Sequence, residues 1–349
     1  MGWKDRPRWV SPAINFGVSV ALGAFFTWLA MRDVDFEKVG ECLATVDYWY
    51  LAPYVALMVI IHLVRTFRWG MLITPIAHVP FKKLLPISSV GFLAIVLLPF
   101  RMGEFVRPYL LADKDKITFS AALATCVVER IIDALLVIGL LFAALATIDK
   151  AIPPGVVTSG YVALAIFGGL LLVIVVAMWK RDASIAFWNK LIGVVSKKLA
   201  AKMTAMLAAF IDGLRALKSL PRILGFIGLS LAYWGLAAFG LWLLFEGFHL
   251  ELPFTAAFVV NGILVIGIMV PGGPGFTGPF EIAVKVALVD LFLLPAATNA
   301  SYTIVLHGLQ FGFQLIVGVA FLFSSHVSFV RLVDASGRAA GSLRTEGQP

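Results

Sequence analysis

Long apolar stretches, separated by short polar segments, make up most of the sequence. Each of six stretches holds about 20 or more mostly apolar residues, the length that an α-helix needs to cross a bilayer. They occupy residues 12–31, 50–74, 118–147, 156–179, 221–245 and 296–325. The first follows a basic segment, as in a signal peptide, but it is long and no small-residue cleavage site follows it. We therefore predict an all-α polytopic membrane protein with six full spans, the first of them uncleaved.

Two further apolar regions, 84–112 and 256–294, are each interrupted near the middle, at 99–103 and at 271–275. The second interruption reads P-G-G-P-G, which cannot keep helical hydrogen bonding. Irregular backbone at membrane depth occurs only where protein surrounds it or where it lines a wet cavity, because lipid offers no hydrogen bonds. We interpret both regions as re-entrant broken-helix hairpins. The alternative for the first is a complete crossing by 84–100, whose 17 residues are at the lower limit for a span.

The residues after the second interruption predict where a helix restarts. Gly278 suits the N-cap, Pro279 the first helical position and Glu281 the first turn. A half-helix that begins inside the membrane points its free N–H groups and positive dipole end into the cavity, which favours an anion such as phosphate or carboxylate. The alternative is a simple kink between packed spans, since Gly and Pro are common in membrane helices.

The two interrupted regions resemble each other in the order of their residues. Gly91 precedes Pro99 by eight residues, Gly262 precedes Pro271 by nine, and each proline meets a glycine four residues later. Three predicted full crossings lie between corresponding points, so the second region is inverted relative to the first. Paired interruptions in inverted halves point to a transporter site near the midplane. We predict an inverted-repeat, transporter-like architecture, which fails if the first region crosses completely.

Composition and charge agree with a membrane protein. Of the 349 residues, 60% are hydrophobic and 14% charged, and the mean hydropathy is +0.95. The net charge of +8 does not indicate a nucleic-acid partner, because the charges lie between apolar spans. Two cysteines are too few for a disulfide scaffold.

Charge placement predicts the orientation. The connection 180–222 has nine Lys and Arg against two Asp, a net +7, so the positive-inside rule makes it cytoplasmic. Within it, 180–220 has apolar residues at helical spacing beside lysines, which predicts a cytoplasmic amphipathic elbow on the inner surface or, alternatively, a solvated one. A single transmembrane domain over 12–325 then lies between a cytoplasmic N-terminus, 1–11, and a cytoplasmic tail, 326–349, whose small polar residues predict disorder.

Three charges fall within the first interruption, at Arg101, Glu104 and Arg107. A charge in the membrane interior costs roughly 2.5 to 3.5 kcal/mol on insertion scales, so these charges should pair with one another or meet a ligand. The two arginines have donor forks that suit phosphate, while Glu104 can hold one of them or attract an ammonium headgroup. An interfacial cluster that reaches to the headgroups explains the same residues.

Three more charges, Glu129, Arg130 and Asp133, lie halfway along the predicted span 118–147. Glu129 and Asp133 are four residues apart and share a helical face, and Arg130 is spaced to pair with Asp133. The triad is a candidate proton relay, a counter-charge for the arginines of the first interruption or a substrate contact. A purely structural buried network remains the alternative.

Arginines in the second span add two further candidates. Arg65 is a candidate for lining a cavity, whereas Arg68, toward the cytoplasmic end, is expected to snorkel to the interface.

Polar residues near the end of the chain complete the set. His307, Gln310 and Gln314 share one face of the last span and favour interhelical hydrogen bonding. Glu281 and Lys285 are spaced for an ion pair within one helix.

The sequence lacks several catalytic signatures. It contains no P-loop Gly-Lys-Ser/Thr, no H-E-x-x-H, no C-x-x-C and no G-x-S-x-G motif. We therefore expect no metal, no cofactor and no enzymatic activity, and any energy input would come from an ion gradient or from lipid mass action.

Three motifs, R-M-G-E-F-V-R-P at 101–108, E-R-I-I-D at 129–133 and P-G-G-P-G at 271–275, resemble the lysylphosphatidylglycerol synthase transmembrane-region family, also called the flippase-like domain family. The similarity covers about 12–325. It implies a bacterial or archaeal inner-membrane protein that moves an anionic or aminoacylated phospholipid, or a related lipid-linked substrate, between leaflets. Bifunctional members continue into a soluble aminoacyltransferase domain, and because this chain ends at 349 we expect a stand-alone member without synthase activity.

The resemblance also implies which positions matter. The last span lacks an arginine that family members often have, and His307 lies near that place. The positions that match the family's motifs are Arg101, Gly103, Glu104, Arg107, Pro108, Glu129, Arg130, Asp133, Pro271, Gly272, Gly273 and Gly275.

The leading hypothesis is a lipid flippase with the headgroup in a polar midplane cavity and the acyl chains in lipid. The partner is a membrane lipid, no nucleic acid is expected, and the chain can oligomerise. Three alternatives stay open: a lipid-modifying enzyme that uses Glu129 and Asp133 as acid and base, a secondary transporter of a small anion, and a scaffold. The residues expected to bind the headgroup are Arg65, Arg101, Glu104, Arg107, Gly272, Gly273 and Gly275.

Overall fold

The protein is built from helices joined by turns. A computed structural model describes residues 12–114, 117–148, 151–194, 196–215 and 220–324, and these contain no strand. The predicted N-terminal segment 1–11 and the tail 326–349 lie outside the described residues. Within the described residues, each of the six predicted spans corresponds to a long helix. These helices are α1 (Pro12–Met31), α3 (Leu51–Ile73), α6 (Phe119–Leu145), α7 (Pro154–Trp179), α10 (Leu220–Gly247) and α13 (Ala296–Ser324).

Four helical segments are long and apolar enough to cross a membrane by themselves, Tyr48–Ile73, Pro154–Trp179, Leu220–Gly247 and Ala296–Phe323. A fifth candidate is the pair of α1 and α2 (Phe36–Ala44), which meet at a bend of 80°. Helix α6 has 27 residues, also enough to cross, but it carries three charges at its middle. The chain is therefore an all-helical membrane protein with four or five apolar spans, and the count of six crossings stays a prediction.

The first broken segment is a helical hairpin. Helix α4 (Phe81–Leu97) ends at Leu98, whose extended backbone (ψ 137°) is the conformation favoured before a proline. A 3₁₀ helix, η2 (Pro99–Phe105), and helix α5 (Val106–Lys114) follow, and α5 packs back against α4. The chain thus turns at the predicted interruption, and α4 and α5 form the two limbs of the hairpin.

The second broken segment has a more irregular tip. Helix α11 (Phe254–Gly267) is followed by a short 3₁₀ turn, η3 (Pro274–Phe276), then by α12 (Pro279–Lys285) and a π-helical turn, η4 (Val286–Leu291). Left-handed backbone occurs at Gly275 (φ 72°), Phe276 (φ 65°) and Gly278 (φ 98°). Helix α12 begins as predicted, because Gly278 is its N-cap and Pro279 its first residue.

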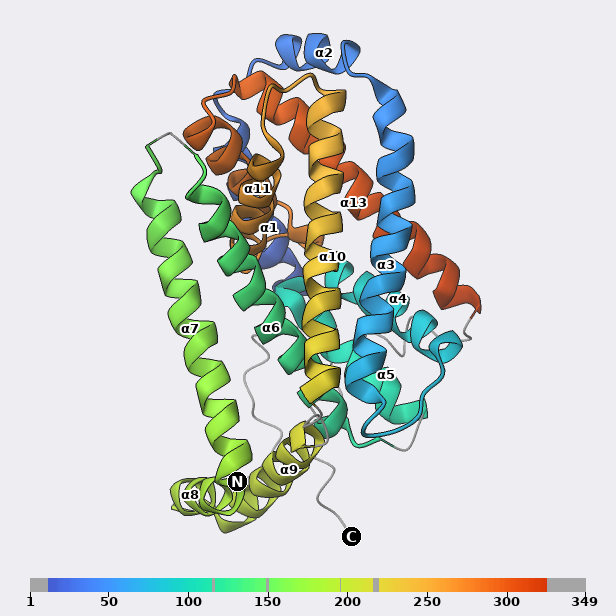
Figure 1. The fold of residues 1–349 in the computed structure, drawn as a ribbon, viewed down its shortest axis with the longest axis vertical. Coiled ribbons are helices and arrows are strands. Elements are labelled where there is room, and N and C mark those ends of the chain that lie inside the picture. Colours follow the sequence, from blue (N-terminus) through green and yellow to red (C-terminus); the bar gives the residue numbers. More distant parts are fainter. Residues whose placement is uncertain (1–11, 115–116, 149–150, 195, 216–219, 325–349) are drawn as a thin grey trace.

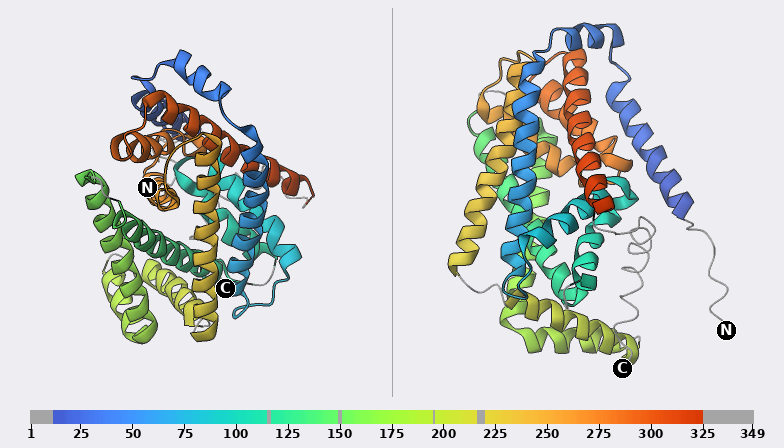
Figure 2. Two further views of the ribbon diagram at one scale, coloured as in Figure 1. Left: turned by 45° about the horizontal axis from the view of Figure 1, so that its top comes forward. Right: turned by 90° about the vertical axis from the view of Figure 1, so that its right-hand side faces the viewer.

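The two hairpins lie toward opposite ends of the molecule. Figures 1 and 2 show α4 and α5 in the half that contains α8 (Arg181–Gly193) and α9 (Lys197–Arg215), and α11 and α12 in the half that contains α2. Helices α8 and α9 pack on each other within the region predicted as an elbow.

Packing between the two halves of the chain is reciprocal. Helix α3 packs against α10, α4 packs against α13, and α11 packs against α6. Each first limb thus contacts the long helix that follows the other break, which is the pattern expected of two halves related by a two-fold axis. The inverted repeat itself stays a prediction.

Candidate functional site

A cavity of about 280 Å³ lies where the tips of the two hairpins meet. Its wall is largely apolar and aromatic, with polar groups contributed by both tips and by α3, α6, α10 and α13, as expected of a site that holds a small molecule. The ionisable side chains that line it are Tyr54, His62, Arg65, Arg101, Glu104, Arg130, Asp133, Tyr233 and His307.

Arg101 connects the two tips. Its Nη1 donates to the carbonyl oxygen of Ile268 (3.2 Å), while its Nη2 donates to Oε1 of Glu104 (2.9 Å). The guanidinium also lies 5.5 Å from the centre of the Phe276 ring. Arg101 has a positive φ of 57°, which is uncommon outside glycine and frequent at functional sites. This arginine thus belongs to the first tip and contacts the second.

Glu129 of α6 anchors the first hairpin from behind the cavity wall. Its Oε2 accepts from Nη2 of Arg107 (2.9 Å), and both side chains are buried, at 0% and 1% exposure. Gly91 of α4 makes room for this contact, since a Cβ there would overlap the Arg107 side chain. This arrangement contradicts the expectation that Arg107 contacts phosphate, because its guanidinium is enclosed by protein and does not line the cavity.

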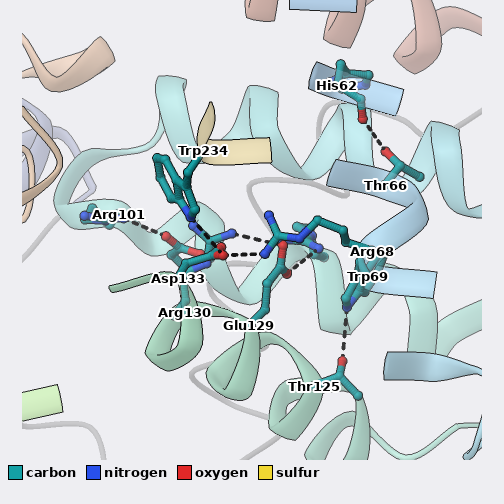
Figure 3. Close-up of polar contacts among 12 residues, drawn as sticks. His62, Thr66, Arg68, Trp69, Arg101, Thr125, Glu129, Arg130, Asp133 and Trp234 are labelled. Carbon is teal, nitrogen blue, oxygen red and sulfur yellow. Dashed lines mark hydrogen bonds and ion pairs between the residues drawn. The ribbon is translucent and has the colours of Figure 1, made fainter. Parts of the chain in front are cut away.

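Asp133 of α6 pairs with a different arginine from the one predicted. Arg68 of α3 forms an ion pair with Asp133, and Nε1 of Trp234 donates to the same carboxylate (3.3 Å) (Figure 3). The Arg68 guanidinium is fully buried and lies 4.7 Å from the Tyr233 ring centre. The expected snorkelling of Arg68 is therefore wrong, because the packing of α3 against α10 turns this face of α3 inward.

Arg130 points to the cavity and has spare hydrogen-bonding capacity. Its Nη2 lies 3.3 Å from Oε1 of Glu129, an ion pair without the alignment of a hydrogen bond, and Nε and Nη2 have no acceptor among the described residues. The predicted pairing of Arg130 with Asp133 is not what the structure has, because Arg68 occupies that carboxylate. Nε and Nη2 of Arg130 are enclosed by protein, whereas the rest of this side chain, which is 30% exposed, lines the cavity and brings positive charge to it.

Among the five arginines in and behind the cavity wall, Arg65 is the one without a carboxylate partner among the described residues. It lines the cavity, and its guanidinium lies 3.4 Å above the centre of the Phe92 ring. Five arginines (65, 68, 101, 107 and 130) stand against three carboxylates (104, 129 and 133) in and behind the cavity wall, a formal charge of +2. The cavity therefore favours a negatively charged guest.

The second tip is held by His307 of α13. The ring Nδ1 lies 2.6 Å from Oε1 of Glu281, Nε2 lies 2.8 Å from the carbonyl oxygen of Gly275, and Phe280 stacks on the ring at 4.2 Å. Glu281 is thus engaged with another helix and not with Lys285, contrary to the pair expected from their spacing.

Glu281 also caps its own helix. Its Oε2 accepts from the backbone N–H of Gly278 (2.5 Å), a capping interaction that satisfies a donor at the start of α12. The expectation that this helix start would offer that N–H to an anion is therefore wrong. The Glu281 carboxylate already accepts from this N–H group.

The remaining candidates divide between the cavity and the turn. Gly275 lines the cavity, whereas Gly272 accepts from Oγ of Ser19 in α1 (2.7 Å) and the N–H of Gly273 donates to Thr277 (2.9 Å). The latter two glycines shape the turn and do not line the cavity. Among the described residues no three His, Cys, Asp or Glu side chains gather as metal ligands.

Sequence reasoning missed two polar residues of the site. Trp234 donates to Asp133, and the hydroxyl of Tyr54 accepts from Nε2 of Gln310 (3.3 Å). An aromatic residue in an apolar span gives no signal of its own, because its ring suits lipid or protein equally well. Gln310 was predicted to bond between helices, and it does.

The comparisons with known proteins give one family. The model described as "Lysylphosphatidylglycerol synthase TM region" matches residues 16–318, which include all three motifs on which the resemblance rested. No curated protein and no solved structure matches the chain.

Proposed function

We propose that this chain, which belongs to the lysylphosphatidylglycerol synthase TM region family, moves a lipid with an anionic headgroup between the leaflets of its membrane. Membership of the family supports a role in lipid handling. The single observation that carries the choice of an anionic headgroup is the excess of two arginines over carboxylates around the cavity, with Arg65 unpaired among the described residues. The substrate class is an anionic or aminoacylated phospholipid or a lipid-linked anion.

In this proposal three arginines bind the phosphate. Arg65, Arg101 and Arg130 line the cavity from α3, the first tip and α6, so a phosphate between them would meet donors from three directions. The part of Arg130 that faces the cavity, and not its enclosed Nε and Nη2, would make this contact. The acyl chains stay in the surrounding lipid, and the mostly apolar cavity wall accommodates the glycerol region.

The arrangement of the hairpins supports alternating access. The two hairpins lie toward opposite ends of the molecule (Figure 2), and residues of both tips line the cavity. Movement of one hairpin would open the cavity toward one leaflet, as inverted repeats do in secondary transporters. The basic region around α8 and α9 supports a cytoplasmic location for that end, in the inner membrane of a bacterium or archaeon.

We do not propose the lipid-modifying enzyme. Glu129 and Asp133, its candidate acid and base, are buried in ion pairs with Arg107 and Arg68, and Glu129 does not line the cavity.

The proposal is tested by transbilayer movement of fluorescent lipids in proteoliposomes. We expect labelled phosphatidylglycerol to move faster than labelled phosphatidylcholine, and Arg65→Gln to slow it about tenfold, the effect of losing one charged hydrogen bond. Arg32→Gln is the matched control, since Arg32 is exposed and pairs with its neighbour Asp33. Equal rates for the two lipids, or an unchanged rate in Arg65→Gln, would contradict the proposal.

A further inference from the structure

We propose that His307 and Glu281 form a proton-binding site that latches the tip of the second hairpin, so that release of one proton frees the tip from α13. The inference rests on the proposed function only where it concerns lipid movement. The proton site itself follows from the hydrogen-bonding partners of the histidine ring.

The contacts of the ring require an additional proton. Nε2 faces a backbone carbonyl oxygen, which only accepts, so this nitrogen carries a proton. Nδ1 faces a carboxyl oxygen of Glu281 at 2.6 Å, and a hydrogen bond there needs a second proton, which lies on Nδ1 because an imidazole is more basic than a carboxylate. The pair therefore holds one proton more than a neutral histidine beside a carboxylate. A flipped ring would place carbon atoms at both contacts, so the assignment of the nitrogens is fixed by the two acceptors.

Among the charged groups around His307, Glu281 is the one that forms an ion pair with the protonated ring. The described parts of α1, α11 and α13 have no other charged side chain, and no charged side chain of α2 or α4 lines the cavity. The other ionisable groups on elements that pack against α12 and α13, or that share the cavity, are Glu37, Lys38, Glu41, Cys42, Tyr54, His62, Arg65, Arg68, Lys82, Lys83, Arg101, Glu104, Arg130, Asp133, Tyr233, Lys285, Asp290 and Tyr302. Among the described residues, the carboxylate in contact with His307 is that of Glu281.

Loss of the proton has a defined structural consequence. Nδ1 keeps its proton because its partner is a carboxylate, so the proton leaves Nε2 for water in the cavity. The lone pair of Nε2 then faces the lone pairs of the Gly275 carbonyl, and the contact becomes repulsive. His307 therefore binds the tip only while the pair holds its additional proton.

The tip is built to respond to that loss. Gly275 and the bulky Phe276 both have left-handed backbone, a conformation that persists only where surrounding contacts enforce it. Contacts from outside the hairpin that act on this turn include the bond from His307 to Gly275, the packing of Arg101 on Phe276 and the bond from Ser19 of α1 to Gly272. Of these three, the bond from His307 is the one that depends on the additional proton. Gly275 and Phe276 also line the cavity. Release by His307 therefore opens one side of the cavity wall.

Glu281→Gln tests whether the contact between His307 and Gly275 depends on the additional proton. A glutamine at this position accepts the Gly278 N–H through its oxygen and donates to Nδ1 through its nitrogen, so a neutral ring keeps its bond to Gly275. The latch then stays closed at every pH. The double variant Glu281→Gln with His307→Phe keeps the cap and the aromatic ring but removes the latch.

Lipid movement in proteoliposomes separates these states. For the native protein we expect the rate to rise about tenfold from about pH 6 to about pH 8, the effect of one charged hydrogen bond. Glu281→Gln should be slow at both pH values, and the double variant fast at both. A merely structural role would slow both variants alike, and that result would overturn the proposal. Loss of the pH dependence in His62→Gln, with its retention in Glu281→Gln, would assign the titration to the other cavity histidine and would overturn it too.

A second measurement does not depend on transport. In ¹⁵N-histidine-labelled protein in bilayers, the signal that disappears in the double variant belongs to His307. We expect protons on both ring nitrogens in the native protein at about pH 6 and on one in Glu281→Gln. The same ¹⁵N pattern in both proteins would overturn the proton site. If no lipid moves at any pH, the proposed function fails and this measurement alone decides the inference.

Discussion

The first broken segment is anchored by arginines in ion pairs, whereas the second is held mainly by hydrogen bonds to backbone groups. In the first, Arg107 enters a buried ion pair with Glu129 of α6, and Arg101 pairs with Glu104 within the tip. In the second, backbone carbonyl oxygens accept from Ser19 of α1, from Arg101 of the first tip and from His307 of α13, and Glu281 both caps α12 and contacts His307.

This difference separates an anchored hairpin from a releasable one. A buried ion pair cannot open without exposing charge to an apolar surrounding, so the first hairpin keeps its position and presents Arg101 to the cavity. Hydrogen bonds to a backbone carbonyl are exchanged at little cost when water enters. The same broken-helix design thus provides a fixed binding surface on one side of the cavity and a movable wall on the other.

The largest effect that follows is on stability, from breaking the anchor. Arg107→Gln leaves Glu129 buried without its hydrogen-bonded partner, so we expect a loss of about 3 to 5 kcal/mol in the free energy of unfolding. Thermal unfolding of the detergent-solubilised protein measures it. The control is Arg181→Gln, which removes an exposed arginine paired with Asp212 on α9 and should cost less than about 1 kcal/mol.

A second variant makes the test of the anchor specific. Replacing both partners, Arg107→Met with Glu129→Met, removes the uncompensated charge and should recover part of the loss. Equal stability of Arg107→Gln and Arg181→Gln would show that the first hairpin is not anchored by this pair.

Glycine substitutions at the two turns compare the hairpins directly. A Cβ on Gly103 would overlap the backbone of α4 at Ala94 and Ile95, so Gly103→Ala has to push the limbs apart and should cost about 1 to 3 kcal/mol. At Gly275 the Cβ would meet the movable Phe311 ring, and the cost is mainly that of left-handed backbone, about 1 to 2 kcal/mol. Thermal unfolding ranks the two.

Gly308→Ala is the matched control, because no atom lies within 4 Å of the Cβ it would add to α13. It should leave stability unchanged or raise it by up to about 1 kcal/mol, the helix propensity of alanine over glycine. A larger loss at Gly275 than at Gly103 would reverse the assignment of the rigid and the releasable hairpin.

Features that depend on residues adjacent in the sequence could be predicted, whereas contacts that depend on how the helices pack could not. The interruptions and the start of α12 at Gly278 follow from local backbone chemistry, and the structure has both. The pairing of Arg68 with Asp133 does not follow, because the direction in which Arg68 points is set by how α3 packs against α10. The position of a residue along a span therefore predicts its depth in the membrane, whereas its ion-pair partner can be identified only from the tertiary structure.

Glu281 gives the same lesson at the site itself. Spacing within one helix favours Lys285 as its partner, and such pairs contribute only about 0.2 to 0.5 kcal/mol. A buried bond to His307, 26 residues further along the chain, replaces it. The pairing rule for neighbours on one helix fails here, because the electrostatic attraction between Glu281 and an enclosed partner is stronger than that between Glu281 and an exposed one.

The smallest expected effect distinguishes these two partners of Glu281. In a double-mutant cycle on thermal unfolding, we expect a coupling near zero, within about 0.3 kcal/mol, between Glu281→Gln and Lys285→Gln, since additivity holds for side chains without contact. The cycle of Glu281→Gln with His307→Phe should give a coupling of about 1 kcal/mol or more, because Glu281→Gln replaces the charged hydrogen bond to His307 by a neutral one and His307→Phe removes the bond altogether. Equal couplings in the two cycles would mean that the Glu281 carboxylate interacts with Lys285 of its own helix as strongly as with His307. The second tip would then be held within its own helix, as the sequence spacing alone suggests, and the contrast between an anchored and a releasable hairpin would lose its basis at α13.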